Sequence, residues 1–358
     1  MKIDDKTSHN SPSIRFPEFT GEWKKCKIED ITDAVSSGKS KNHFSNGEYN
    51  LYGSTGIIGR TDKALYDGKL VLVARVGANA GFLQIINEPC GITDNTLILK
   101  PKGIDAFCLY YFLQHFNLNR LIFGSGQPLI TGGMLKKVKV SLGTISEQSK
   151  IVKFLSLLDE RIATQVRLIE DLKKLRCAVS NKLFQSVKGV VIPLSGISNI
   201  VKGKQINGDF LAEVGEYYVM NGGTEPSGYY DNYNVEANTI SISEGGNSCG
   251  YVQFNRMPFW SGGHCYTIQD IVSDVETLYL YHYLKSKEDS IMKLRIGTGL
   301  PNIQKKDLAE FKVIIPAIEQ QRTISNILSL LERKTEIEGR MLIAMRTEKQ
   351  YLLHQMFI

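Results

Sequence analysis

The sequence predicts an α+β protein in which two β-rich globular domains in tandem are each followed by a long α-helix. The two helices are expected to pack as an antiparallel coiled coil with pseudo-two-fold symmetry. Three observations predict this fold: a length of 358 residues, an internal repeat, and two long segments that each carry one apolar stripe. The length favours two domains, because single hydrophobic cores rarely grow beyond roughly 250–300 residues.

The repeat consists of short blocks that recur in the same order, at a spacing of about 170 residues. The clearest pair is GSGQPLI at 124–130 and GTGLPNI at 297–303, with four identities in seven positions. The other pairs are 47–56 with 215–224, 74–84 with 243–253, and 154–158 with 327–331. Small changes in spacing between fixed blocks are typical of loops in a duplicated domain.

The duplication divides the chain into five expected segments. These are a flexible N-terminus (1–15), a first domain (16–145), a central helix (146–186), a second domain (187–318) and a C-terminal helix (319–358). Runs such as LVLV and TISI between Gly, Asn and Ser clusters are typical of short strands joined by turns. Short helices are expected at 105–116 and 276–288, with their aromatic side chains in the core.

Both long segments have apolar residues at spacings of three and four, which predicts amphipathic helices. The first stripe consists of Ile151, Leu155, Leu158, Ile162, Val166, Ile169, Leu172, Leu175, Val179 and Leu183. Thr144 and Glu147 predict a capping box at its start. The second stripe is weaker in its middle, and Gly339 there predicts fraying or a bend. Helices of about 60 Å must bury their stripes, and the repeat partner is the nearest candidate, although coils between two chains remain open.

Charge and cysteine content exclude several classes of protein. The formal net charge of +6 permits a nucleic-acid partner without requiring one. The six cysteines form no CxxC pair, the first 15 residues lack an apolar stretch, and no apolar run approaches the roughly 18 residues of a membrane span. We therefore expect a soluble, cytoplasmic protein with free thiols and no membrane partner.

Motifs for catalysis are incomplete. Residues 246–250 match G-x-S-x-G, but the equivalent 77–81 keeps both glycines without the serine, so the glycines indicate a shared backbone turn rather than a hydrolase site. A GKS at 38–40 lacks the first glycine of a phosphate loop. Cys249, His264 and Cys265 lack metal-ligand spacing and have no counterparts in the first copy. The tetrapeptide that positions the target amine in amino-methyltransferases is missing, so we expect no catalytic or metal-binding residues.

Two sets of polar residues in Gly-rich loops remain, and they suit DNA recognition, because Arg, Asn, Gln and Lys read base edges while small turns approach phosphates. The first set is Lys39, Lys41, Tyr52, Ser54, Thr55, Arg75, Asn79, Ser125 and Gln127. The second set is Lys202, Lys204, Gln205, Asn221, Thr224, Asn247, Ser248 and Thr298, with Glu244 beside them. Two equivalent loop sets match the reading of two DNA half-sites.

The chain resembles the specificity subunits of type I restriction–modification systems. The similarity rests on IRFPEFTGEW at 14–23, on the EQ-x-K-I-x-x-F-L-S-x-L-D block at 147–159 with its echo at 319–331, and on the repeated G-[ST]-G-x-P-x-I. It extends over essentially the whole chain from residue 14 onward. The resemblance implies that 16–145 and 187–318 are target recognition domains, each reading one half of a bipartite, asymmetric sequence in double-stranded DNA.

The resemblance also implies the partners. The two helices would act as a ruler for the gap between half-sites and would dock two methyltransferase subunits, and the assembly can recruit restriction subunits. The chain itself would bind no cofactor, since S-adenosylmethionine, ATP and Mg²⁺ are used by the partner subunits.

Two alternatives remain from the residues alone. One is a free-standing DNA methyltransferase with fused recognition domains, and the other is a tandem module with a coiled-coil stalk that binds something other than DNA.

The charge distribution adds an expectation for DNA binding. Residues 1–145 hold 18 basic and 13 acidic side chains, whereas residues 187–318 hold 11 and 14. The second domain should therefore bind DNA weakly by electrostatics alone, leaving much of the binding to the methylating partners.

Overall fold

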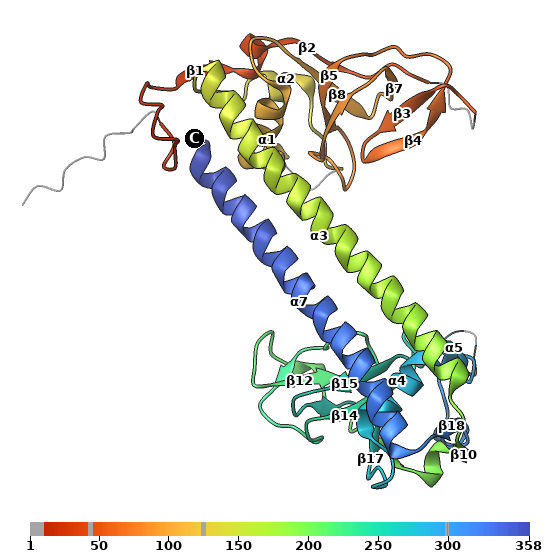
Figure 1. Ribbon diagram of the computed structural model, residues 1–358. Coiled ribbons are helices and arrows are strands. Elements are labelled where there is room, and N and C mark those ends of the chain that lie inside the picture. Colours follow the sequence, from red (N-terminus) through yellow and green to blue (C-terminus); the bar gives the residue numbers. More distant parts are fainter. Residues whose placement is uncertain (1–10, 42–45, 123–126, 298, 300) are drawn as a thin grey trace, which may run out of the picture. The chain divides into compact units, whose positions relative to one another are not determined.

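The structure, a computed structural model, describes residues 11–41, 46–122, 127–297, 299 and 301–358. It divides into two compact units (Figure 1). Unit 1 consists of Met1–Val166 together with Arg340–Ile358, and unit 2 of Arg167–Gly339. Each unit thus contains one β-rich domain, half of the helix that follows it, and half of the other long helix.

Unit 1 is built on two sheets and a two-stranded ribbon. The larger sheet has the antiparallel order β2-β8-β5-β6, the smaller one the order β4-β3-β7, and β1 pairs with β9. The strands are β1 (Lys24–Lys27), β2 (Thr32–Ser37), β3 (Tyr49–Gly53), β4 (Gly56–Thr61), β5 (Lys69–Ala74), β6 (Leu83–Asn87), β7 (Cys90–Ile92), β8 (Thr96–Pro101) and β9 (Lys139–Leu142). The α-helices of this domain are α1 (Ala106–Phe116) and α2 (Gly132–Lys136), and short 3-10 helices span Ile28–Ile31 and Leu118–Leu121.

Unit 2 repeats this topology strand for strand. Its sheets have the orders β11-β17-β14-β15 and β13-β12-β16, and β10 pairs with β18. The strands are β10 (Val190–Pro193), β11 (Asn199–Lys202), β12 (Tyr217–Met220), β13 (Tyr229–Tyr230), β14 (Thr239–Ser243), β15 (Val252–Asn255), β16 (Trp260–Ser261), β17 (Cys265–Gln269) and β18 (Lys312–Ile315). The α-helices are α4 (Thr277–Ser286), α5 (Glu288–Met292) and α6 (Lys305–Ala309), and short 3-10 helices span Leu194–Gly196 and Gly208–Phe210. Even the single parallel pairing recurs, as β3 with β7 and β12 with β16, so the predicted duplication is confirmed at the level of strand order.

The aromatic residues of the short helices lie in the core, as predicted. Helix α1 packs on β5 and β6, where Tyr111 and Phe112 are almost fully buried. Helix α4 packs on β14 and β15 and buries Tyr279 and Tyr283 in the same way. These aromatics supply large apolar surfaces that hold each helix on its sheet.

The two long helices are α3 (Ile145–Ser186) and α7 (Ile318–Met356). They start alike, because the side-chain amide of Gln148 donates to the carbonyl of Gly143 at 3.0 Å and that of Gln321 donates to the carbonyl of Pro316 at 2.9 Å. The predicted capping box is half present. The Thr144 hydroxyl accepts from the Glu147 amide at 3.3 Å, but the Glu147 carboxylate accepts two hydrogen bonds from Arg15 instead. The charged guanidinium is the stronger partner for a buried carboxylate.

Within each unit the two helix halves pack antiparallel. In unit 1, Lys349 Nζ of α7 lies 2.5 Å from Asp159 Oδ1 of α3, and the Tyr111 hydroxyl donates to the other oxygen of Asp159 at 2.8 Å. Unit 2 contains the equivalent ion pair with the roles of the helices exchanged. Arg176 of α3 donates to Glu332 of α7 at 2.9 Å, and the Tyr281 hydroxyl donates to the same Glu332 oxygen at 2.8 Å.

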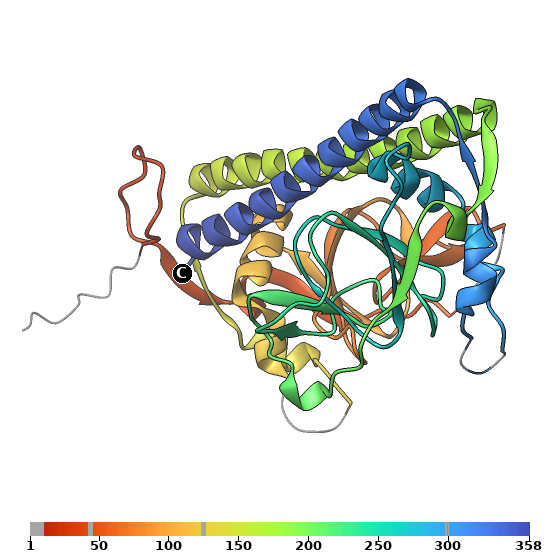
Figure 2. The same ribbon diagram turned by 90° about the horizontal axis from the view of Figure 1, so that it is seen from below.

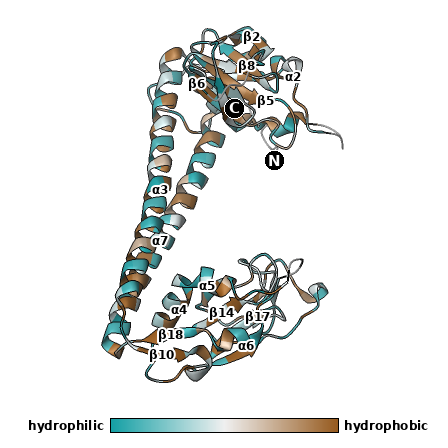
Figure 3. Ribbon diagram, turned by 90° about the vertical axis from the view of Figure 1, so that its right-hand side faces the viewer, coloured by the Kyte–Doolittle hydropathy of each residue, from teal (hydrophilic) through white to brown (hydrophobic). Residues whose placement is uncertain are grey.

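One position of the predicted stripe on α3 is wrong. Leu175 is 48% exposed, and the neighbouring Arg176 turns toward α7 in its place. The exchange follows from the ion pair with Glu332, which needs a cation at that point of the seam. Helix α7 runs without interruption through Gly339, so the predicted fraying at this glycine is not observed. The alternative prediction, a bend at Gly339, stays a prediction. Figure 3 shows hydrophilic and hydrophobic residues mixed along both helices, as an amphipathic pair requires.

The segment before β1 joins the two helices within unit 1. The Ile14 amide donates to the Gln355 carbonyl of α7 at 3.0 Å, and Arg15 pairs with Glu147 of α3. Phe16 makes an edge-to-face contact with Phe154. Figure 2 shows the end of α7 beside the first turns of α3. Of the expected flexible N-terminus, residues 1–10 lie outside the described part, whereas Ile14 and Arg15 are bound. No helix among the described residues is both long and apolar enough to cross a membrane.

We expect Glu332→Gln to lower the free energy of unfolding by about 1–3 kcal/mol, because hydrogen bonds that Arg176 and Tyr281 make to a charged partner would weaken. Glu336→Gln is the matched control, since Glu336 is half exposed and lies 4.0 Å from its only described ion-pair partner, Arg256. Urea denaturation of both variants measures the difference. Equal effects of the two substitutions would contradict the idea that Arg176 is costly to leave without its charged partner.

Candidate nucleic-acid interface

A tight turn follows the inner strand β5 of unit 1. The Gly81 amide donates to the Ala74 carbonyl at 2.8 Å, and the Ala80 amide donates to the Gly77 carbonyl at 2.9 Å. Gly77 and Gly81 have φ angles of 79° and 89°, a region that glycine adopts without steric cost. The chain therefore needs glycine at these two positions.

The same turn follows β14 in unit 2. The Gly250 amide donates to the Ser243 carbonyl at 2.8 Å, the Cys249 amide to the Gly246 carbonyl at 3.1 Å, and the two glycines have φ angles of 74° and 91°. The G-x-S-x-G sequence is thus a backbone turn shared by both copies, as predicted from the repeat.

A second segment of the chain crosses each turn and holds it. In unit 1 the Gly77 amide donates to the Pro128 carbonyl at 3.0 Å, and the Ile130 amide donates to the Arg75 carbonyl at 2.9 Å. In unit 2 the pairs are Gly246 with Pro301 at 3.0 Å and Ile303 with Glu244 at 2.8 Å. Ile130 and Ile303 are fully buried. The burial of these side chains explains why the isoleucine of the repeated G-[ST]-G-x-P-x-I recurs.

In unit 2 the turn borders a cavity of about 650 Å³, most of whose lining residues have polar side chains. Four residues of the predicted DNA-binding set line this cavity, namely Lys202, Asn221, Asn247 and Ser248. Lys204, Gln205 and Thr224 are exposed but do not line it, and Thr298 lies outside the described residues.

The buried carboxylate of Glu244 also lines this cavity. Its Oε1 accepts from Lys202 Nζ at 2.6 Å and from the Tyr266 hydroxyl at 3.1 Å. Among the described residues Oε2 has no hydrogen-bond partner, and His264 Nδ1 lies 3.8 Å from it. Burial, followed by the charge of Glu244, raises the pKa of Tyr266, so this hydroxyl remains a donor to the carboxylate at neutral pH.

The predicted residues of unit 1 are distributed over several places. Lys39 and Lys41 line a cavity of about 650 Å³ together with Asp94 and Asn95. Asn79 lines a separate cavity of about 480 Å³ beside α1. Ser54 and Thr55 form the turn between β3 and β4, and Gln127 is exposed, whereas Ser125 lies outside the described residues.

Tyr52 and Arg75 differ in how they are bound. The Tyr52 hydroxyl donates to Glu88 at 2.5 Å, and burial is the main cause that raises its pKa to about 12. Tyr52 therefore has an internal partner. Arg75 is half-buried, and its Nε has no hydrogen-bond partner among the described residues.

The predicted DNA-binding sets do not include Asn95 and His264, whose carbonyls accept from the amides of Arg75 and Glu244, both at 2.9 Å. The repeat spacing of 169 relates these two residues and could have found them. No group of three or more His, Cys, Asp or Glu residues that could hold a metal ion occurs in the described part of the chain. Cys249 and Cys265 are buried, while the His264 side chain is 63% exposed.

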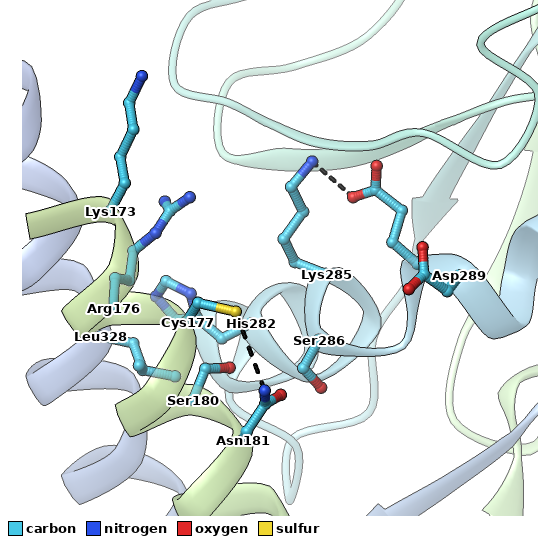
Figure 4. Close-up of a pocket in the computed structure, with 11 residues that line it drawn as sticks. Lys173, Arg176, Cys177, Ser180, Asn181, His282, Lys285, Ser286, Asp289 and Leu328 are labelled. Carbon is cyan, nitrogen blue, oxygen red and sulfur yellow. Dashed lines mark hydrogen bonds and ion pairs between the residues drawn. The ribbon is translucent and has the colours of Figure 1, made fainter. Parts of the chain in front are cut away.

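A further cleft of about 300 Å³ lies in unit 2 between the last turns of α3 and the helices α4 and α5 (Figure 4). Both Lys285 and Arg176 have ion-pair partners inside unit 2, since Lys285 pairs with Glu288 at 2.6 Å and Arg176 with Glu332 at 2.9 Å. Burial is the main cause that lowers the pKa of His282 to about 4, and the neutral ring shares a 2.9 Å hydrogen bond with Ser329. Cys177 also lines this cleft, and it is the one exposed cysteine among the six.

Comparison with known proteins identifies the class. Residues 20–174 and 187–344 match the family described as "Type I restriction modification DNA specificity domain". The chain therefore belongs to this family, and it carries two such domains in tandem.

The relatives are specificity subunits of type I systems. A putative type I specificity subunit of Mycoplasma genitalium is 25% identical over 94% of both chains, and one of Mycoplasma pneumoniae is 31% identical over 46% of this chain and 44% of its own length. The crystal structure of the type I restriction–modification S subunit from M. genitalium shares the fold with a TM-score of 0.71, at 23% identity over 97% of this chain and 99% of its own. This chain is likewise a type I specificity subunit, a DNA-recognition component.

We expect Cys177 to react first when the folded protein is treated with a maleimide at pH 8. Four of the other thiols are buried and Cys26 is half-buried, and burial is the main cause that raises the pKa of all five. Mass spectrometry should find one rapidly added label, which Cys177→Ser removes while Cys26→Ser does not. Rapid labelling of two or more thiols in the native state would contradict this assignment.

Proposed function

We propose that this chain reads a bipartite, asymmetric DNA sequence, one half-site per β-rich domain, and performs no catalysis itself. The observation that carries the proposal is the glycine turn that follows β5 in unit 1 and β14 in unit 2. In each unit a second segment of the chain holds this turn by backbone hydrogen bonds, and polar side chains lie beside it. Phosphate contacts from exposed lysines such as Lys39 and Lys204 would fix the register on the duplex. Side chains at the turns would discriminate bases, at about 1–3 kcal/mol for each good bidentate pair.

The helices are proposed to act as the ruler between half-sites. Helix α3 is one element of 42 residues that begins in unit 1 and ends in unit 2, and at 1.5 Å per residue it is about 63 Å long. A target whose half-sites have the matching spacing can then engage both domains at once, and the second contact becomes intramolecular.

The helices are also proposed to dock two methyltransferase subunits. Leu157 and Leu330 occupy equivalent positions of the repeated block, one in each unit, and their exposed fractions are 56% and 68%. Two equivalent exposed leucines suit two copies of one partner. Restriction subunits can join this assembly, and S-adenosylmethionine, ATP and Mg²⁺ would be used by the partners.

Mapping of modified bases tests the recognition of a split site. When the chain is expressed with its methyltransferase partner, we expect modified adenines on both strands of a sequence with two specified halves and an unspecified gap. The purified chain with S-adenosylmethionine alone should methylate nothing, which separates a specificity subunit from a free-standing methyltransferase. Modification confined to contiguous palindromes would contradict the proposal.

A matched shortening of both helices tests the ruler. Residues 164–170 and 338–344 lie between the ion pairs Asp159–Lys349 and Arg176–Glu332, so deleting both segments keeps each pair in register. The deletion shortens each helix by about 10 Å, close to 3 base pairs of DNA. We expect the original gap to be lost or replaced by a shorter one in the modified sites. Unchanged modification of sites with the original gap would refute the ruler.

A further inference from the structure

Arg75 and Glu244 occupy the same backbone position in their respective domains. Each directly follows an inner strand of the larger sheet, β5 or β14. Each amide donates to the carbonyl of an equivalent residue, Asn95 or His264, at 2.9 Å. Each carbonyl accepts from an equivalent buried isoleucine, Ile130 or Ile303, at 2.9 and 2.8 Å.

The side chains at this position are chemically opposite. Arginine is a fork of hydrogen-bond donors with no acceptor, and an ionised glutamate only accepts. Because both domains form the turn with the same backbone hydrogen bonds, the turn itself requires neither side chain. Two domains with different base preferences need such a position, because its backbone stays the same while its side chain can carry either charge.

One oxygen of the Glu244 carboxylate can accept a hydrogen bond from a donor outside the unit. Glu244 is 8% exposed and lines the cavity, and its buried Oε2 has no hydrogen-bond partner among the described residues. His264 Nδ1, at 3.8 Å, lies beyond hydrogen-bond distance of this oxygen. Leaving a buried acceptor unpaired is costly, so a donor is expected to enter the cavity. A phosphate cannot supply one, because it offers only acceptors and negative charge. Lys202 holds Oε1 at 2.6 Å and offsets the negative charge of Glu244 near DNA.

In the major groove, exocyclic amines are the donors that bases offer. Cytosine presents its N4 amine beside a carbon, whereas adenine presents its N6 amine beside the acceptor N7, which would repel the second carboxylate oxygen. Cytosine is therefore the better partner for Glu244. Guanine presents two adjacent acceptors, O6 and N7, which match the two parallel donors of an arginine such as Arg75.

We propose that the position shared by Arg75 and Glu244 reads one base pair in each half-site, guanine through Arg75 and cytosine through Glu244. This inference rests on the proposed function and specifies the base chemistry of its site. We therefore expect G in one half-site and C in the other. The two bases lie at the same distance from the modified adenine when each half-site is numbered in the orientation in which its own domain binds it.

The test maps modified sites for the chain assembled with its methyltransferase partner, using wild type, Arg75→Gln and Glu244→Gln. We expect Arg75→Gln to relax the G position of one half-site, and Glu244→Gln the C position of the other, with discrimination reduced about tenfold or more. The matched controls are Lys100→Gln and Glu236→Gln, which change exposed residues near the opposite ends of β8 and β14. Both controls should leave the modified sequence unchanged.

Other outcomes separate the possibilities. Failure of the wild-type assembly to modify any split site would contradict the proposed function. Two results would overturn the base-reading role without touching the proposed function. In one, the variants still require G and C at the two positions of the split site; in the other, they lower modification equally at all sites. Thermal unfolding is measured in parallel. If Glu244→Gln does not fold, Glu244→Asp keeps the charge but withdraws the carboxylate by one methylene, and it should relax the same C position.

Discussion

In each unit, one carboxylate joins the two long helices and the β-rich domain. Asp159 binds Lys349 of the other helix and Tyr111 of α1, while Glu332 binds Arg176 of the other helix and Tyr281 of α4. Partly buried ion pairs contribute little net stability, but an unmatched charge in the seam is costly, so such pairs specify register and direction. Antiparallel packing follows, because only that arrangement brings residue 159 to 349 and residue 176 to 332. Within each unit the same carboxylate also joins the helices to the β-rich domain, because a tyrosine of the short helix α1 or α4 donates to it.

The general plan of the fold was predictable because it rests on periodicity and repetition. Apolar spacing located both long helices, and the repeated glycines indicated a turn before any backbone angle was known. The exchange of Leu175 for Arg176 was not predictable, since it depends on a carboxylate more than 150 positions away along the chain. For the same reason the Glu147 carboxylate was assigned to a local cap rather than to Arg15.

The candidate site was predictable in type but only partly in its members. Loop composition selected Lys202, Asn221, Asn247 and Ser248, which the fold brings to one cavity. It could not distinguish Tyr52, whose hydroxyl is bound to Glu88, from residues that remain open. The significance of Arg75 and Glu244 depends on their hydrogen bonds to Asn95 and His264, and strand pairing creates these across the sheet. Composition therefore indicates which side chains can bind DNA, while the pairing of strands decides which of them are presented together.

Because both repeats lie on one polypeptide, their helices meet at an effective concentration set by the chain, independent of how much protein is present. Two separate identical chains would carry the same residue at both copies of a site, and symmetric partners recognise symmetric sequences. Here arginine and glutamate stand at equivalent positions of a single chain. Under the proposed function the recognised DNA sequence is therefore asymmetric, and the protein binds it in one orientation. A substitution in one repeat can change one half of that sequence while the other half is retained.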